Sequence, residues 1–340
     1  MKKRKIKTLI IEDSRLYQAY MTKILASDEQ IEVGGVAGSA KEALQLLEQE
    51  KPDVITLDLG LPDVTGFELL TTLKQRYGIP IIVVTSIPKM CEKALALGAE
   101  DFVEKVQSAE KRVTEQFALL LKLKIKMQAG SFSGTKTAAA RVPKVMPGHQ
   151  IRDSVIVIGA SLGGTEATLE ILKDLPEWMP GILVVQHMPV GFTKAYAMRL
   201  DQNCRMTVKE AKSEDKVEKG TVLVARGGSQ MRLYKTVDGY RVRISEDDGK
   251  HNFCPSVDVL FESAAMAAGE RATGVILTGM GRDGARGMVL MHQKGSYTIG
   301  QDEETCAVYG MPRAAAEAGA VDIQLPKQEI AEHLIRRFGE

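Results

Sequence analysis

Short apolar runs alternate with longer amphipathic stretches along the first third of the chain. Runs with the length of buried strands cover residues 8–11, 33–36, 54–57, 81–84 and 102–103. Residues 41–50 and 67–77, which lie between these runs, and residues 108–128, which follow the last of them, place apolar side chains at helical spacing. This alternation predicts a parallel sheet with helices on both faces. Ligand sites in such sheets lie at the carboxyl ends of the strands.

The same alternation returns from residue 154 onward. Strands are predicted at 154–159, 182–186 and 274–278, and helices at 165–173 and 256–268. Residues 206–244 differ, because short alternating segments are separated by Gly227-Gly228 and Asp238-Gly239, which favour turns. We therefore expect a second, doubly wound α/β domain with a small antiparallel excursion at residues 206–244.

Residues 126–150 interrupt both patterns. This segment is rich in Gly, Ala, Ser, Thr and Pro and contains no acidic residue. It shows neither helical nor strand periodicity, so we interpret it as a flexible linker. The predicted organisation is one domain at 1–125, a linker at 126–150 and a second domain at 151–340, in keeping with the length of 340 residues.

Composition excludes several classes of function. Lys and Arg number 45 against 44 Asp and Glu, and the net charge of +1 excludes binding of a polyanion through bulk charge. Aromatic residues make up only 5%, which argues against a base-stacking surface and so against a nucleic-acid partner. No apolar run approaches the ~20 residues of a membrane span. Glu12 and Asp13 end the first apolar stretch too early for a signal peptide. We expect a soluble cytoplasmic protein with no membrane insertion.

The four cysteines offer no candidate site. They lie far apart, without disulfide or zinc-site spacing, at Cys91, Cys204, Cys254 and Cys306. We expect them to be small buried apolar side chains.

Polar side chains follow the strands predicted in the first domain. Glu12 and Asp13 follow the first strand, Asp58 the third, Thr85 ends the fourth and Lys105 the fifth. In a parallel sheet these side chains converge on one edge. Three carboxylates in one pocket favour a hard divalent cation such as Mg²⁺. A carboxylate beside that cation can attack a phosphoryl group, and a nearby ammonium group can neutralise the resulting charge.

This pattern resembles the receiver domain of two-component response regulators, over about residues 5–125. The resemblance implies a flavodoxin-like fold with a parallel five-stranded sheet and phosphorylation by a histidine kinase. It implies that Asp58 is the phosphoacceptor and that Glu12 and Asp13, with Asp58, bind Mg²⁺.

The same resemblance implies a set of switch residues. They are the hydroxyl of Thr85, the aromatic ring of Phe102 and the ammonium group of Lys105. The loop at 61–66 matches the segment after the phosphoacceptor. One departure is Val106, which stands after Lys105 where receivers usually have a proline.

A serine flanked by glycines follows the first strand of the second domain. In Gly159-Ala-Ser-Leu-Gly-Gly-Thr165, a tight strand-to-helix turn can project the Ser161 hydroxyl at the edge of the sheet, as in a Gly-x-Ser-x-Gly elbow. The N–H groups of the following helix favour negative charge there. A dinucleotide-binding fingerprint fails because Ser161 stands where its second glycine is needed. A Walker loop fails for want of Gly-Lys-Ser/Thr.

Two further residues complete a candidate catalytic set. His187 ends the neighbouring strand and can reach Ser161 as a general base. Asp283, in the glycine-rich loop after the strand at 274–278, is the candidate to orient His187. The order Ser, His, Asp disfavours the α/β-hydrolase fold but is no objection to a triad, which is defined by geometry. Structural or solvent-facing roles are expected for the other histidines, His149, His251, His292 and His333.

The second domain resembles the chemotaxis protein-glutamate methylesterases. The matching motifs are at residues 159–165, 186–193, 255–261, 277–285 and 309–313. The resemblance implies a Rossmann-like doubly wound α/β domain without a cofactor. It implies Ser161 as nucleophile, His187 as base, Asp283 as orienting carboxylate and the backbone N–H of Met280 as oxyanion donor.

The resemblance also implies substrates and regulation. That family joins a receiver to the esterase domain, hydrolyses glutamate methyl esters on methyl-accepting chemotaxis receptors with release of methanol, and in many members deamidates glutamines. We expect the unphosphorylated receiver to cover the cleft and phosphorylation to weaken that interaction.

Some positions depart from the family pattern, and two other functions stay open. Leu162 replaces a common Thr, Arg226 and Gln230 stand where Pro and His are usual, and Cys254 replaces a frequent Arg. The alternatives are an NAD-dependent oxidoreductase, which predicts cofactor binding, and a phosphorylation-controlled adaptor without enzyme activity, which predicts receptor binding and no methanol release.

Overall fold

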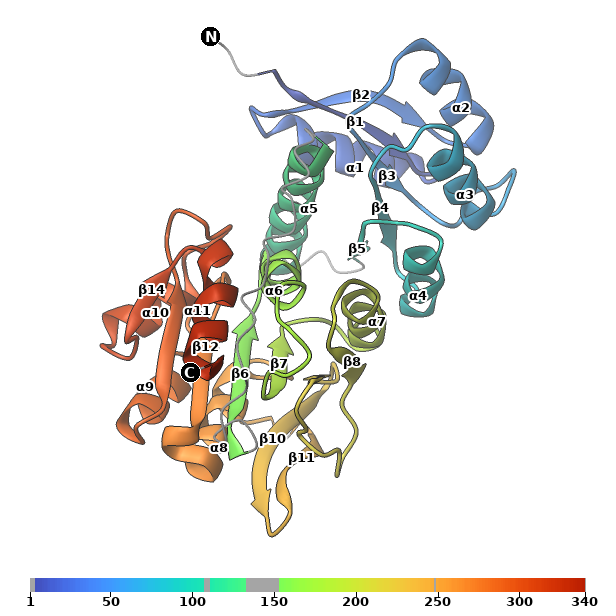
Figure 1. The fold of residues 1–340 in the computed structure, drawn as a ribbon. Helices are drawn as coiled ribbons and strands as arrows, with labels where there is room; N and C mark the ends of the chain where they lie inside the picture. Colours follow the sequence, from blue (N-terminus) through green and yellow to red (C-terminus); the bar gives the residue numbers. More distant parts are fainter. Residues whose placement is uncertain (1–3, 107–110, 133–152, 248, 340) are drawn as a thin grey trace. The chain divides into compact units, whose positions relative to one another are not determined.

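The protein is described by a computed structural model that covers residues 4–106, 111–132, 153–247 and 249–339 (Figure 1). The chain divides into two compact units, Met1–Ala139 and Ala140–Glu340.

Among the described residues of the N-terminal unit, five strands form one parallel sheet in the order β2-β1-β3-β4-β5. The strands are β1 (Ile6–Ile11), β2 (Ile31–Ala37), β3 (Val54–Leu57), β4 (Ile81–Thr85) and β5 (Asp101–Glu104). The helices are α1 (Arg15–Ala26), α2 (Ala40–Gln49), α3 (Gly66–Arg76), α4 (Pro88–Ala96) and α5 (Lys111–Phe132). Every position of β3 and β4 is buried, as in strands that are covered on both faces. The predicted flavodoxin-like fold is confirmed.

The predicted start of the linker at residue 126 is wrong. Helix α5 continues to Phe132 because contacts with other elements hold its last turns, including Ala129 against the apolar core. Lys126 forms an ion pair of 2.7 Å with Asp28, and Gln128 is buried. The rest of the proposed linker, with His149, lies outside the described residues.

In the C-terminal unit, the described residues form a seven-stranded parallel sheet in the order β14-β13-β12-β6-β7-β9-β8. Its strands are β6 (Val155–Ala160), β7 (Gly181–Gln186), β8 (Thr207–Glu210), β9 (Thr221–Val224), β12 (Ala272–Ile276), β13 (Tyr297–Gln301) and β14 (Ile323–Leu325). A separate antiparallel hairpin is made of β10 (Ser229–Thr236) and β11 (Gly239–Glu246).

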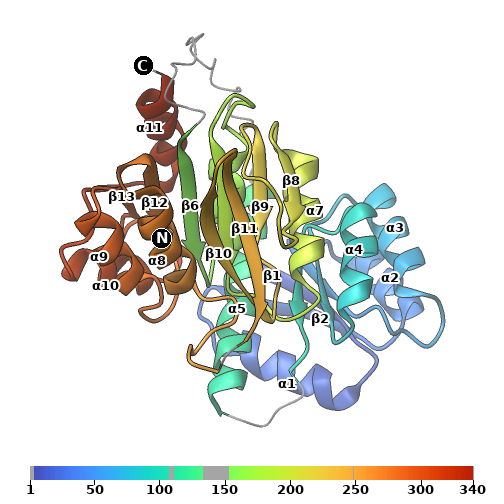
Figure 2. The same cartoon turned by 90° about the horizontal axis from the view of Figure 1, so that it is seen from below.

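Helices cover both faces of this sheet, as the doubly wound prediction requires. They are α6 (Gly164–Leu172), α7 (Thr193–Asn203), α8 (Val257–Ala268), α9 (Ala285–Gln293), α10 (Met311–Glu317) and α11 (Lys327–Gly339). One apolar core joins the sheet to α8, α9, α10 and the hairpin, and a second joins it to α6, α7 and α11. The hairpin packs beside α8 against the sheet (Figure 2).

The antiparallel excursion is smaller than the predicted 206–244. The hairpin turns near Asp238-Gly239 as expected, but β8 and β9 extend the main sheet in parallel. The reason is that β8 is an edge strand. Only one face is buried, at Val208, so its alternating pattern imitates a half-exposed antiparallel strand. Within the described residues, no helix combines the length and apolar character needed to span a bilayer.

Candidate functional site

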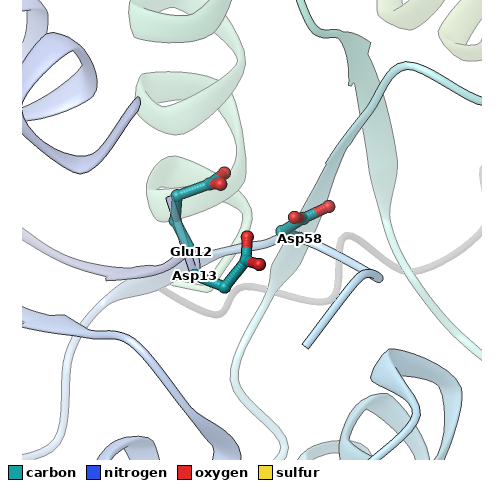
Figure 3. Close-up of side chains that lie close together, drawn as sticks. All are labelled: Glu12, Asp13 and Asp58. Atoms are coloured by element: carbon teal, nitrogen blue, oxygen red, sulfur yellow. The ribbon is translucent and has the colours of Figure 1, made fainter. Parts of the chain in front are cut away.

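Three carboxylates meet at the edge of the N-terminal sheet. Glu12 and Asp13 follow β1 and Asp58 follows β3, and one oxygen from each lies within 4.8 Å of the others (Figure 3). Glu12 and Asp58 are buried and Asp13 is exposed, so the cluster has one side open to solvent. The structure thus brings together the acidic residues that the sequence analysis singled out.

Lys105 neutralises part of this charge. Its Nζ donates to Asp58 Oδ2 at 2.8 Å and to Glu12 Oε1 at 2.9 Å. Burial raises the pKa of the Glu12 carboxyl, and the nearby Lys105 ammonium lowers it only in part. Burial alone lowers the pKa of Lys105, but hydrogen bonds to Asp58 and Glu12 outweigh this and raise it above its usual value. A single ammonium cannot balance three carboxylates, so the pocket retains negative charge.

The remaining charge and the ligand type fit a hard divalent cation. Mg²⁺ prefers carboxylate oxygens and keeps several waters, which requires an open side such as the one at Asp13. The residues that would hold it are Glu12, Asp13 and Asp58.

The predicted switch residues lie on the strands beside this pocket. Thr85 is buried at the end of β4, and its Oγ1 accepts a hydrogen bond of 3.1 Å from the Ile87 N–H. Phe102 is buried in β5, with Lys124 Nζ 5.6 Å from the centre of its ring. Both side chains point into the unit rather than to solvent.

Tyr17, on α1, is a residue that sequence reasoning missed. Its hydroxyl accepts a hydrogen bond of 3.1 Å from the Val106 N–H, and Lys105 Nζ lies 4.9 Å from the centre of its ring. Val106 has this N–H only because it replaces a proline. In the sequence, the only indication of this contact is the valine at position 106 in place of the proline that is usual in receivers.

Ser161 lies in a sharp turn between β6 and α6. Its N–H donates to Thr278 O at 3.0 Å, and Gln186 Nε2 donates to its carbonyl at 2.7 Å. Gly163, the residue before the helix, has φ of 79°, a left-handed conformation that favours glycine. The glycine pattern therefore forms the strand-to-helix turn expected of an elbow.

His187 follows β7 and is held from both sides. Its backbone N–H donates at 3.0 Å to the carbonyl oxygen of Ala160, the residue before Ser161. Its ring Nε2 lies 2.7 Å from Asp283 Oδ2. Its ring stacks on Phe253 with centroids 4.1 Å apart and planes 10° apart. His187 Nδ1 is buried and has no hydrogen-bond partner among the described residues. This nitrogen is available to take a proton.

Asp283 is fixed by several donors at the start of α8. Besides His187, it accepts hydrogen bonds from Ser256 Oγ at 2.8 Å, Val257 N–H at 2.7 Å and Asp258 N–H at 3.1 Å. Burial by itself raises the pKa of Asp283, but the hydrogen bonds and the His187 ring outweigh it and hold the pKa below its usual value. Asp283 therefore remains ionised at neutral pH and keeps the proton of His187 on Nε2.

The loop that follows β12 passes directly beside Ser161. A Cβ added at Gly279 would lie 2.8 Å from Ser161 Cβ, so only glycine allows this approach. Gly279 O accepts from the N–H groups of Gly310 and Met311, which fixes the loop. Met280, the residue that follows Gly279, is 52% exposed. The contact at Gly279 thus holds the loop that carries Met280, the predicted oxyanion donor, against the Ser161 turn.

The other described histidines have structural surroundings. His292 Nδ1 lies 3.2 Å from Asp322 Oδ1, and His333 Nε2 lies 3.0 Å from the hydroxyl of Tyr297. His251 lies in a bend. Sequence reasoning missed Ser256 and Phe253 as contacts of the site, and it noted Gln230 only as a departure.

Known protein families match the N-terminal and the C-terminal unit of the chain separately. The family model "CheB methylesterase" matches residues 156–334, and "Response regulator receiver domain" matches residues 8–118. A protein-glutamate methylesterase/protein-glutamine glutaminase 2 from Syntrophomonas wolfei is 43% identical, with all of both chains covered. A protein-glutamate methylesterase/protein-glutamine glutaminase from Thiobacillus denitrificans is 39% identical, covering 98% of this chain and 97% of that protein. The crystal structure of the Thermotoga maritima CheB methylesterase catalytic domain is 39% identical, with a TM-score of 0.53. It covers 54% of this chain and 98% of that domain.

Proposed function

The chain belongs to the CheB methylesterase family in its receiver-containing form, and we propose that Ser161, His187 and Asp283 perform its protein-glutamate methylesterase reaction. The observation that carries this assignment is the arrangement of the two ring nitrogens of His187. Its Nε2 is held by Asp283 while its buried Nδ1 is unpartnered among the described residues, beside the turn that presents Ser161.

The reaction follows from these positions. His187 Nδ1 takes the proton of Ser161 Oγ, which attacks the carbonyl carbon of a glutamate methyl ester. The N–H of Met280 donates to the oxyanion that forms. His187 returns the proton to the leaving oxygen, and methanol departs. His187 then takes a proton from water, which attacks the carbonyl carbon of the acyl-enzyme. As the bond to Ser161 Oγ breaks, His187 gives this proton to Ser161 Oγ, and the glutamate side chain leaves as an acid that ionises to the carboxylate.

The N-terminal unit regulates this reaction through Asp58. We propose that a chemotaxis histidine kinase phosphorylates Asp58 and that the substrates are methyl-accepting chemotaxis receptors. When bound by Glu12, Asp13 and Asp58, Mg²⁺ would supply charge neutralisation for phosphoryl transfer. Lys105 pairs with the acyl phosphate, and Thr85 and Phe102 respond to it as the switch.

The same site suits glutamine deamidation. A glutamine amide offers Ser161 a carbonyl of the same geometry, and the leaving group is ammonia in place of methanol. The relatives named protein-glutamine glutaminase support this second activity. We expect ammonia release from receptors to require Ser161 as well.

The test measures methanol release from a methylated receptor, with and without a small phosphodonor such as acetyl phosphate. Ser161→Ala should fold and release almost no methanol. Asp58→Asn should keep the basal rate and lose the stimulation. Undiminished hydrolysis by Ser161→Ala would refute the nucleophile, and a normal response by Asp58→Asn would refute the switch. Intact receptor binding without methanol release by the wild type would favour the adaptor alternative.

A further inference from the structure

We propose that Gln230 and Phe253 are positioning residues that together hold His187 and Asp283 in their reactive arrangement. The inference rests on the proposed function, because it takes Ser161, His187 and Asp283 as the reacting set. It concerns a residue at which this chain departs from the family pattern, and it gives Gln230 a defined task.

Gln230 ties the loop before α8 to the start of β10. Its side chain is fully buried, and both ends of its amide are used. Gln230 Nε2 donates to Phe253 O at 2.9 Å, and Gln230 Oε1 accepts from the Ser256 N–H at 2.8 Å. The N–H of Gly228 adds a bond of 3.1 Å to Cys254 O. One amide thus fixes both ends of the segment 253–256.

The far end of this segment supplies the donors of Asp283. Ser256 Oγ donates to Asp283 Oδ1, and the N–H groups of Val257 and Asp258 donate to its two oxygens. Ser256 is also the N-cap of α8. A shift of Ser256 would therefore displace three of the four donors that hold Asp283.

The near end of the segment supplies the ring that covers His187. Phe253 stacks almost parallel to the imidazole, with planes 10° apart. Rotation of the imidazole about its long axis would break this stacking and the hydrogen bond to Asp283 at the same time. Phe253 and Asp283 thus fix the plane and the direction of His187, and Gln230 holds the segment that fixes both.

An amide is the group that this position requires. Gln230→Glu keeps the shape and the acceptor for Ser256 but loses the donor to Phe253 O. Gln230→Met keeps the volume and loses both bonds, which leaves buried polar groups unsatisfied. Displacement of catalytic groups by about 1 Å can lower a rate about 100-fold. Because the segment touches His187 and Asp283, we expect the loss to appear in kcat rather than in KM.

The experiment compares Gln230→Glu, Gln230→Met and Phe253→Leu in the full-length chain, assayed by methanol release from methylated receptor. We expect kcat to fall about 10- to 100-fold with KM changed less than about threefold. The low-field NMR signal of the His187 Nε2 proton, recorded without substrate, should shift or broaden. Leu233→Val is the matched control, since Leu233 is a buried apolar residue on the same strand and outside these contacts. Its kcat and its His187 signal should stay at the wild-type values.

Each other outcome has a defined meaning. A wild-type kcat in the Gln230 and Phe253 variants, with Ser161→Ala inactive, would overturn the positioning role and leave the proposed function intact. Activity in Ser161→Ala would overturn the proposed function itself. An equal loss in Leu233→Val would show that general destabilisation explains the effect and would also overturn the positioning role. If thermal unfolding shows that Gln230→Met does not fold, Gln230→Glu and Phe253→Leu decide the matter.

Discussion

The chemistry of the C-terminal unit depends on which nitrogen of His187 carries the proton. The ionised Asp283 accepts from Nε2, so the neutral imidazole presents Nδ1 as its basic nitrogen. The assignment follows from the hydrogen-bond network around Asp283. A single residue that accepts without donating therefore sets the direction of proton transfer.

Asp283→Asn should test this dependence. An asparagine amide can donate to His187 Nε2, which would move the proton to Nδ1 and remove the base. We expect kcat for methanol release to fall by about two to four orders of magnitude. Asp322→Asn, beside His292 on the surface, is the control and should keep the wild-type rate. Activity within about twofold of wild type in Asp283→Asn would contradict the role of Asp283.

The same variant should change the pH dependence of stability. The pKa of Asp283 is lower in the folded than in the unfolded state, because hydrogen bonds from His187 and the start of α8 outweigh the effect of burial. Its contribution to stability is therefore fully present above the unfolded pKa of about 4, and it is lost as pH falls through the folded value. The difference in Tm between wild type and Asp283→Asn should shrink below about pH 4. A constant difference down to pH 2.5 would contradict this cause.

At the scale of single residues, the sequence predicted the site residues that stand directly after apolar runs. Ser161, His187 and Asp58 all follow strands, and a parallel sheet collects such positions at one edge. Gln230, Ser256 and Tyr17 could not be found in this way, since their partners are distant in sequence and no local spacing marks them.

The turn between β6 and α6 is the element on which the nucleophile depends. A Cβ at Gly164 would lie 2.4 Å from Gln186 Oε1 and 2.5 Å from Ala160 Cβ, closer than side chains allow. Gln186 in turn donates to Ser161 O. The glycine is therefore required by close packing around the serine.

Gly164→Ala should lower both activity and stability. The added methyl group must displace Gln186 or Ala160, so we expect a loss of Tm by thermal unfolding and a fall in methanol release of at least about tenfold. Gly130→Ala on α5 is the matched control. A Cβ there meets no atom within 4 Å, and the change should stabilise the helix by up to about 1 kcal/mol. Wild-type behaviour of Gly164→Ala would show that the turn tolerates a side chain.

Lys105 and Val106, the residues that follow β5, form the second segment that positions a reacting group. Val106 donates to the Tyr17 hydroxyl, and the ring of Tyr17 faces Lys105. The hydrogen bond thus restrains Val106, at a position where a proline ring is usual in receivers.

Tyr17→Phe should therefore slow phosphorylation of Asp58. It keeps the ring but removes the acceptor for the Val106 N–H, and we expect the rate with acetyl phosphate to fall severalfold, by about 1 kcal/mol. Adding Val106→Pro should restore the rate, because proline has no N–H to satisfy. Tyr20→Phe is the control, since the buried Tyr20 hydroxyl has no hydrogen-bond partner among the described residues. Equal effects of Tyr17→Phe and Tyr20→Phe would contradict the role of this bond.

Among the elements, alternation of apolar runs and amphipathic stretches sufficed for the two parallel sheets. It failed where burial is one-sided or where polar contacts hold an element. The edge strand β8 looked antiparallel, and the last turns of α5, held by the Lys126–Asp28 ion pair, looked like a linker.

At the scale of the whole molecule, the two units have separate apolar cores. The core of the N-terminal unit is formed around Ile10, Val84 and Leu121, and those of the C-terminal unit around residues such as Leu260 and Leu334. Each unit therefore has what it needs to fold alone, and regulation requires only that the state of one unit change the activity of the other.

Residues 153–340 produced alone should fold and hydrolyse methylated receptors without any response to acetyl phosphate. We expect their rate to exceed that of the unphosphorylated full chain, because the inhibition expected from the receiver unit is absent. Full-length Asp58→Asn is the matched control, since it keeps the receiver unit but cannot be phosphorylated and should stay at the low basal rate. A rate no higher than this control would show that the unphosphorylated receiver does not restrain the enzyme. Stimulation of the isolated unit by acetyl phosphate would locate the switch outside Asp58.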